Sequence, residues 1–130
     1  MPAPIITEGD CFISRFTLKP ERRDEFLAMF TGLVDNFRDA MGETTHFVFY
    51  GWSRAGEYVA IESWKSPEIV AAVRADPAFV DLIGKLLDCC AKPMQMEVFN
   101  AMNSDGSVFT LNPVGKSTVH PDVGVGAAFI

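Results

Sequence analysis

The sequence is short of positive charge and has no long apolar run. It contains 11 Lys and Arg against 17 Asp and Glu, which gives a formal net charge of -6 at pH 7. Non-specific nucleic-acid binding and attraction to anionic membranes both depend on basic residues, so this balance argues against both. No segment approaches the ~20 consecutive apolar residues that a membrane-spanning helix needs. We therefore expect no nucleic acid and no membrane among the partners of this chain.

Sequence features that hold cofactors or metals are also missing. No glycine-rich phosphate loop is present, so nucleotide and flavin binding have no support. The two histidines, His46 and His120, are scattered, and no paired-carboxylate motif accompanies them, which argues against a metal site. Cys11, Cys89 and Cys90 form neither a disulfide framework nor a metal-binding spacing. The sequence therefore predicts neither a metal nor a cofactor, and we expect the adjacent cysteines to fill space at a helix end.

Length and composition predict one domain with a C-terminal extension. At 130 residues, 48% of them apolar, the chain can bury one sizeable core. We expect the domain at residues 1–102, because residues 103–130 change in composition, rich in Pro, Gly and β-branched residues. This extension is expected to pack on the partner subunit or over a pocket mouth, the alternative being a mobile tail. The first ten residues lack the basic and apolar regions of a signal peptide, so a cytoplasmic location is expected.

The hydrophobic pattern predicts strands and helices in the order βαββαβ. Alternation and β-forming residues mark strands at residues 11–18, 44–53, 57–65 and 94–102, with a further short strand at 108–111. Apolar spacings of three and four mark helices at residues 20–41, 67–74 and 77–90. The core stripe predicted for the first helix consists of Phe26, Phe30, Leu33, Phe37 and Met41. This order is the α+β, ferredoxin-like arrangement.

Apolar side chains on both faces of the sheet predict a dimer. In the strand at residues 44–53, alternation puts one set of side chains on one face and a second set on the other: His46, Val48, Tyr50 and Trp52 against Phe47 and Phe49. The helices can cover only one face, and the uncovered face would leave a large exposed apolar patch. A homodimer whose two sheets face each other buries that patch.

Two closely spaced helix starts follow the third strand. The strand ends in Glu62-Ser63-Trp64. Ser66-Pro67-Glu68 then combines an N-cap, a proline at the first helical position and an acid at the positive helix end. Asp76-Pro77 repeats this kind of start about three turns later. A strand that ends at a Trp and leads into two capped helices resembles the antibiotic-biosynthesis-monooxygenase-like family of dimeric α+β barrels.

The resemblance covers about residues 10–102 and is carried by residues 16–21, 61–66 and 76–79. It implies a homodimer with a pocket between the sheet and the helices of each subunit. Members of the family include cofactor-independent monooxygenases that act on polyketide quinols, quinol monooxygenases and haem-degrading enzymes.

Position by position, the match to the active members is incomplete. Trp64 matches the Trp that lines their pocket. Ser14 and Ile83 stand where haem-degrading relatives have an Asn and an iron-binding His, so haem degradation is not expected. Ala60 stands where polyketide-type monooxygenases have an Asn, and the His of quinol-type members has no counterpart near residues 73–74. The residues that carry the fold are present, whereas the polar groups familiar from these enzymes are not.

The candidate catalytic residues are His46, Glu62 and Arg15. His46, whose reference pKa is near 6.5, or Glu62 could take a proton from a substrate. Arg15 or Arg74 could hold the resulting anion. Each also has a structural interpretation: His46 as a hydrogen-bonded histidine at a strand edge, and Arg15 with Glu62 as a buried ion pair.

The candidate substrate-binding residues are Trp64, Arg74, Ser14, Asn100 and Tyr58. Trp64 would form an aromatic wall of the pocket, or alternatively belong to the core or the dimer interface. Tyr58, Glu62 and Trp64 share one face of their strand. Ser14 and Asn100 would donate or accept hydrogen bonds.

Taken with the resemblance, these residues favour a monooxygenase without a cofactor that acts on a phenolic, quinol or polyketide-like aromatic. The protein would assist deprotonation of the substrate, and the anion would reduce O₂ directly in a cavity that excludes water. Two alternatives remain open at this point. One is a non-catalytic dimer that binds a small aromatic ligand, and the other is an isomerase or lyase on the same fold.

Overall fold

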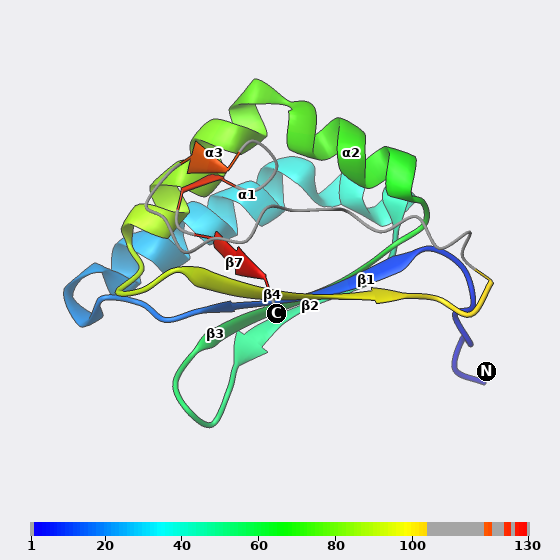
Figure 1. Ribbon diagram of the computed structural model, residues 1–130, viewed down its shortest axis with the longest axis horizontal. Coiled ribbons are helices and arrows are strands. Elements are labelled where there is room, and N and C mark those ends of the chain that lie inside the picture. Colours follow the sequence, from blue (N-terminus) through cyan, green and yellow to red (C-terminus); the bar gives the residue numbers. More distant parts are fainter. Residues whose placement is uncertain (1, 104–118, 121–123, 126, 130) are drawn as a thin grey trace.

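The helices that the structure describes all lie on one face of a five-stranded sheet (Figure 1). A computed structural model describes residues 2–103, 119–120, 124–125 and 127–129. Its elements are β1 (Asp10–Phe16), the short 3-10 helix η1 (Pro20–Arg22), α1 (Arg23–Thr44), β2 (Thr45–Trp52), β3 (Tyr58–Trp64), α2 (Pro67–Ala75), α3 (Pro77–Asp88) and β4 (Met94–Asn100). The predicted α+β, ferredoxin-like order βαββαβ is confirmed, including the break in the second crossover helix.

The sheet has the strand order β2-β3-β1-β4, and neighbouring strands within it are antiparallel. β7 (Ala127–Phe129) extends it by pairing in parallel with β4, while β5 (Val119–His120) and β6 (Gly124–Val125) pair with each other. The strand predicted at 108–111 lies outside the described residues. Among the described residues, no helix is both long and apolar enough to span a bilayer.

The two helix starts form as their sequences predict. The backbone N–H of Ile69 donates to Ser66 Oγ at 3.3 Å, and the N–H of Ala78 donates to Asp76 Oδ1 at 2.9 Å. Each side chain satisfies a donor that the first helical turn leaves without an intrahelical partner. The chain can therefore turn sharply at Asp76 and still cover the sheet with two helices.

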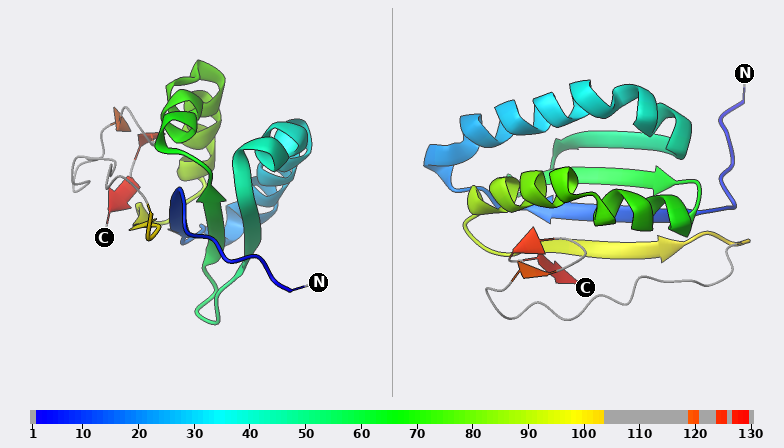
Figure 2. Two further views of the ribbon diagram at one scale, coloured as in Figure 1. Left: turned by 90° about the vertical axis from the view of Figure 1, so that its right-hand side faces the viewer. Right: turned by 90° about the horizontal axis from the view of Figure 1, so that it is seen from above.

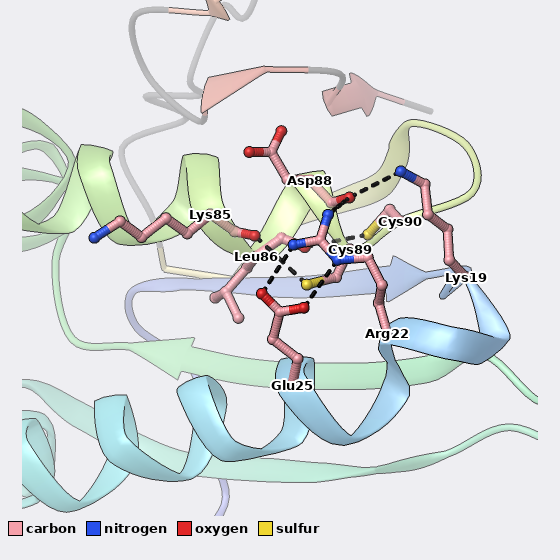
Figure 3. A network of polar contacts seen from close by, with 8 residues as sticks. All are labelled: Lys19, Arg22, Glu25, Lys85, Leu86, Asp88, Cys89 and Cys90. Carbon is pink, nitrogen blue, oxygen red and sulfur yellow. Dashed lines mark hydrogen bonds and ion pairs between the residues drawn. The ribbon is translucent and has the colours of Figure 1, made fainter.

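The C-terminal end of α3 is tied to the start of α1 (Figure 3). Arg22 Nη1 and Lys19 Nζ donate to the carbonyl oxygen of Asp88, at 2.7 and 3.1 Å. Arg22 also forms two hydrogen bonds of 2.9 Å with Glu25, and this pairing holds the pKa of the Glu25 carboxyl below its usual range. The two cations neutralise the negative end of the helix dipole. Cys89, in the same turn, is fully buried, as expected for a thiol that fills space.

The core is centred on aromatic rings from β1, α1 and β3. The rings of Phe16, Phe26, Phe30 and Tyr58 lie 5.0–6.4 Å apart, mostly in tilted or edge-to-face arrangements. Such geometries add to the free energy of burying the ring surfaces. Tyr58, a predicted substrate-binding residue, therefore belongs to the core.

The core stripe predicted for α1 is correct only in part. Phe26, Phe30 and Met41 are buried and Leu33 is half-buried, but Phe37 is 40% exposed. The prediction that Phe37 lies in the core is therefore wrong. Side chains from α2 and α3 do not close over this part of α1, where a cavity opens between the helices.

The other face of the sheet carries exposed apolar side chains. Phe47 and Phe49 on β2 and Phe99 on β4 are 44%, 58% and 46% exposed. No described helix lies over this face (Figure 1). Exposed aromatic rings gathered on one face are typical of a surface that binds a partner.

Candidate functional site

A cavity of about 190 Å³ lies between the covered face of the sheet and the helices. Its floor is built by alternate residues of β1, β3 and β4, including Phe12, Trp64 and Met96. α1 forms one wall, and α2 with α3 forms the other. Figure 2 shows these two groups of helices side by side over the sheet. The lining is mostly apolar, so a ligand in the cavity would exchange water for hydrocarbon and aromatic surface.

Alternation along the strands brings several predicted residues into this cavity. Ser14 on β1 and Glu62 and Trp64 on β3 line it, together with Ala60. Tyr58 points to the same side of β3 but into the aromatic core. The face predicted for β3 is therefore the covered face, and it supplies both the carboxyl group and the indole of the site.

Glu62 places a carboxyl group in apolar surroundings. Burial raises the pKa of this carboxyl, while a hydrogen bond from Tyr50 and the charge of Arg74 act in the opposite direction. The Tyr50 hydroxyl donates to Glu62 Oε2 at 3.0 Å. A carboxyl whose pKa is raised binds a proton more strongly than one in water, which makes its carboxylate a stronger base.

Tyr50, which supports Glu62, was not among the predicted site residues. It lies directly opposite Ala60 in the β2–β3 pair, diagonal to Glu62. The Tyr50 side chain passes the small Ala60 side chain and reaches Glu62. Phe30 packs edge-on against the Tyr50 ring, with 4.8 Å between the two ring centroids. Burial and the nearby Glu62 charge raise the pKa of the Tyr50 hydroxyl, so it stays protonated and acts as a donor. The register of the β2–β3 hairpin would have revealed this pair.

Arg74 brings a buried positive charge to the same cavity. It lies on the inward side of α2 with Val70 and Val73, at the spacing of one helical face, and is 7% exposed. Its guanidinium carbon is 5.0 Å from the centroid of the Phe12 ring, and Nη2 is 3.5 Å from Met96 Sδ. These contacts fix the guanidinium group, and its charge acts on the Glu62 carboxyl.

His46 lies outside the cavity. The register between β2 and β3 shifts between Thr45 and Phe47, so His46 sits in a bulge. Its side chain is exposed, and its Nε2 is 3.0 Å from the carbonyl oxygen of Glu8. Strict alternation put His46 on the face of Tyr50 and Trp52, and the bulge removes it from that series.

Arg15 and Asn100 also lie away from the cavity. Arg15 is on the opposite face of β1, where its Nη1 is 2.6 Å from Glu97 Oε1. The ion pair expected between Arg15 and Glu62 is therefore wrong, because the two side chains lie on opposite faces of the sheet. Asn100 is exposed at the end of β4 and does not line the cavity.

The backbone of Gly9 packs closely against the backbone of Trp64. Gly9 has a φ of +89°, and a Cβ atom there would overlap the carbonyl oxygen of Trp64. Only glycine combines this backbone conformation with so close a contact. Trp64 itself is 7% exposed and forms part of the cavity floor.

The mouth of the cavity lies between α1 and the junction of α2 with α3. Three of the lining residues are exposed there: Phe37 and Ala40 on α1, and Asp76 at the start of α3. A ligand could enter along this side, with the apolar floor below it. The arrangement can therefore enclose a flat apolar molecule and present one carboxyl group and one guanidinium group to it.

Comparison with known proteins gives information at the level of the fold. No family model matches the chain, and no curated protein is similar to it in sequence. Solved structures do resemble it. A conserved protein from Methanosarcina mazei Go1 has 14% sequence identity and a TM-score of 0.65 over 73% of this chain and 94% of its own.

Two further solved structures carry functional names. One, named antibiotic biosynthesis monooxygenase, is 19% identical with a TM-score of 0.62, over 71% of this chain and 97% of its own. The other is a variant of SnoaB, a cofactor-independent oxygenase from Streptomyces nogalater, at 21% identity and a TM-score of 0.58. It matches over 75% of this chain and 97% of its own. The predicted resemblance to the antibiotic-biosynthesis-monooxygenase-like fold is thus confirmed.

Proposed function

We propose that this protein is a cofactor-independent monooxygenase that acts on a phenolic or quinol-type aromatic. The observation that carries the proposal is the Glu62 carboxyl, which has a raised pKa and lines an apolar cavity beside the buried guanidinium of Arg74. A base and a cation in an apolar cavity are the groups needed to form and hold an aromatic anion. The oxygenases among the structural relatives have the same fold.

The proposed reaction begins with proton transfer. The Glu62 carboxylate takes the proton of a phenolic O–H, and Arg74 stabilises the phenolate that forms. This anion transfers one electron to O₂, and the resulting radical and superoxide combine to a peroxide at a ring carbon that bears hydrogen and lies ortho or para to the phenolic oxygen. The peroxide takes the proton from Glu62 and becomes a hydroperoxide.

Loss of water completes the reaction. The Glu62 carboxylate removes the hydrogen of that ring carbon as a proton while the O–O bond breaks. The departing hydroxide takes this proton and leaves as water. One oxygen atom of O₂ thus becomes the new carbonyl and the other becomes water, while the substrate supplies all four electrons. Glu62 returns to its starting state, and the apolar lining keeps bulk water from the peroxide.

Oxygen uptake provides the direct test of this proposal. We expect metal-stripped protein to consume O₂ with a two-ring hydroquinone or naphthol substrate and to release a carbonyl product labelled by ¹⁸O₂. The Arg74→Met variant keeps much of the side-chain volume and should lose most of this activity. Saturable binding of such compounds without any O₂ uptake would instead favour the non-catalytic ligand-binding dimer. Product formation without O₂ would favour an isomerase or lyase.

Replacing Trp64 with phenylalanine should affect the ligand more than the fold. Phenylalanine keeps most of the apolar surface, so we expect the free energy of unfolding to fall by less than ~1.5 kcal/mol. If Trp64 forms the floor under an aromatic ligand, binding of 1-naphthol should weaken by about tenfold, because ring contact is lost. Calorimetric titration and thermal unfolding measure the two effects. A large loss of stability with unchanged binding would assign Trp64 to the core alone.

Replacing Tyr50 with phenylalanine should shift the pH dependence of turnover. The hydroxyl of Tyr50 donates to Glu62 and lowers the pKa of its carboxyl, so losing it should move the acid limb of kcat/KM to higher pH. The plateau at high pH should change little, because the phenyl ring can keep the contact with Phe30. Tyr58→Phe is the matched control, since Tyr58 also packs on Phe30 and lies outside the cavity. If the acid limb of kcat/KM lies at the same pH in both variants, the Tyr50 hydroxyl does not act on the proton acceptor of the site.

We propose further that the uncovered sheet face forms a homodimer interface in the cytoplasm. Support comes from the exposed rings of Phe47, Phe49 and Phe99, which a second sheet would bury. The packing of residues 103–130 on that partner stays a prediction, as does the division of the chain at residue 102.

Placing a charge on this face should dissociate the dimer. We expect Phe49→Glu to weaken self-association by about a hundredfold or more, because an unpaired buried charge costs several kcal/mol. Sedimentation velocity at micromolar concentration measures this. Phe37→Glu is the control, because it adds the same charge on the helical side of the molecule. A folded, monomeric wild-type protein would contradict the proposal.

A further inference from the structure

We infer that the ligand enclosed by this cavity is a hydroxylated aromatic of two fused rings, and that Phe37 sets this limit on size. The inference rests on the proposed function for the chemical class of the ligand. The size limit itself comes from the geometry of the cavity.

The volume of the cavity selects a small ring system. An apolar cavity of about 150 Å³ in another protein encloses a single benzene ring. The cavity here measures about 190 Å³, which adds room for a second fused ring but not for a third. Because a protein interior is already close-packed, the side chains around the cavity cannot be compressed to admit a third ring.

The closed end of the cavity cannot recede to admit a larger ligand. Phe16, Phe30 and Met94 line it there, and they are only 3%, 6% and 2% exposed. The rings of Phe16 and Phe30 also take part in the aromatic core with Tyr58. Displacing any of these side chains would disturb close-packed neighbours. A longer ligand therefore has to extend toward the mouth.

Phe37 stands at that mouth. It lines the cavity and yet is 40% exposed, so its ring borders both the ligand space and solvent. Ala40, one turn later on α1, is small, so Phe37 is the large α1 side chain on this side of the opening. Removing the Phe37 ring would lengthen the enclosed space without disturbing the core. Phe37 is thus the residue at which ligand size is decided.

The polar groups explain why the ligand should carry a hydroxyl. Glu62 and Ser14 lie on the cavity floor and Arg74 in the wall. A phenolic O–H can donate to the Glu62 carboxylate, and its oxygen can accept from a cation or a hydroxyl. An unsubstituted hydrocarbon would leave these buried polar groups without compensation for the water it displaces.

Binding of phenols with one, two and three fused rings tests this inference and requires no catalytic turnover. Calorimetric titration with phenol, 1-naphthol and 9-phenanthrol gives three dissociation constants for the full-length protein. We expect 1-naphthol to bind about tenfold more tightly than phenol because it buries an additional ring. 9-Phenanthrol should bind at least about tenfold more weakly than 1-naphthol, since its third ring meets Phe37. Naphthalene, measured in parallel, should bind more weakly than 1-naphthol.

The Phe37→Ala variant should reverse the order of the two larger ligands. We expect 9-phenanthrol to gain about tenfold in affinity and 1-naphthol to lose a few-fold, because the enclosed volume grows by most of a ring. Val34→Ala is the control, since Val34 is on the same helix outside the cavity lining. It should leave the order of the ligands unchanged.

Several results would overturn the inference. The wild-type protein could bind 9-phenanthrol as tightly as 1-naphthol, or bind none of the three phenols. The Phe37→Ala substitution could change all three affinities by the same factor. If the three phenols bind in the expected order of affinity but the protein consumes no O₂, the proposed oxygenase function is overturned and the size limit stays in place.

Discussion

Replacing Phe26 with alanine should lower the free energy of unfolding by about 3–5 kcal/mol. Phe26 is fully buried, and its ring lies 5.3 Å from that of Phe16, 5.7 Å from that of Phe30 and 5.3 Å from that of Tyr58. Truncation removes the apolar surface and leaves a cavity whose walls belong to β1, to β3 and to α1 itself. Because those walls are held by the sheet and by α1, they cannot collapse fully around the gap.

The same substitution further along α1 should have a much smaller effect. Phe37 is 40% exposed, so Phe37→Ala should cost less than ~1 kcal/mol. Urea unfolding of both variants at one fixed protein concentration makes the comparison valid even if unfolding is coupled to dissociation of a dimer. Equal losses in the two variants would show that the buried stripe of α1 has been placed wrongly.

The contrast between Phe26 and Phe37 shows how far a helical pattern can be used for prediction. Spacings of three and four identify the side of a helix that faces the protein. They do not indicate where along the helix the facing elements come into contact. The break at Asp76 sets where α2 and α3 cover the sheet, and this depends on the path of the whole second crossover segment. The identity of the helical face was therefore predictable, and the opening at Phe37 was not.

The strands present a similar limit. Alternation correctly put Glu62 and Trp64 on one face of β3, and the structure makes that face the cavity floor. It failed for His46 because one bulge residue shifts every later side chain relative to those before it. It also gave no indication of the partner of Arg15, because pairing with Glu97 depends on which strand lies beside β1. Contacts between distant strands depend on topology and register rather than on local pattern.

Replacing Glu62 with glutamine should nearly abolish turnover. Glutamine keeps the size of the side chain and can still accept a hydrogen bond from Tyr50, but it cannot take a proton. A positioned general base typically contributes 10²–10⁴-fold to a rate, so we expect kcat to fall by about that factor. Glu97→Gln is the matched control, because Glu97 lies on the same sheet but on the opposite face. It should leave kcat unchanged.

The same variant should be more stable than the wild-type protein at neutral pH. Because burial raises the pKa of Glu62 in the folded state, folding favours the protonated carboxyl. The stability of the wild-type protein should therefore fall as the pH rises from the ordinary Glu pKa through the raised one. Glutamine stays uncharged at every pH and escapes this loss, which amounts to about 1.4 kcal/mol for each unit of pKa difference. The charge of Arg74 does not alter the sign, because its attraction for the carboxylate already contributes to that pKa.

Unfolding of both proteins between pH 4 and pH 8 measures this effect. We expect the variant and the wild-type protein to be equally stable at the acid end, and the variant to be the more stable at pH 8. A site that carries a strong base at the expense of stability is typical of a catalytic position, whereas a structural ion pair gives the opposite result. If Glu62→Gln is less stable than the wild-type protein at pH 8, the carboxylate and Arg74 form a stabilising pair. If kcat also survives the substitution, the proton acceptor of the reaction lies elsewhere.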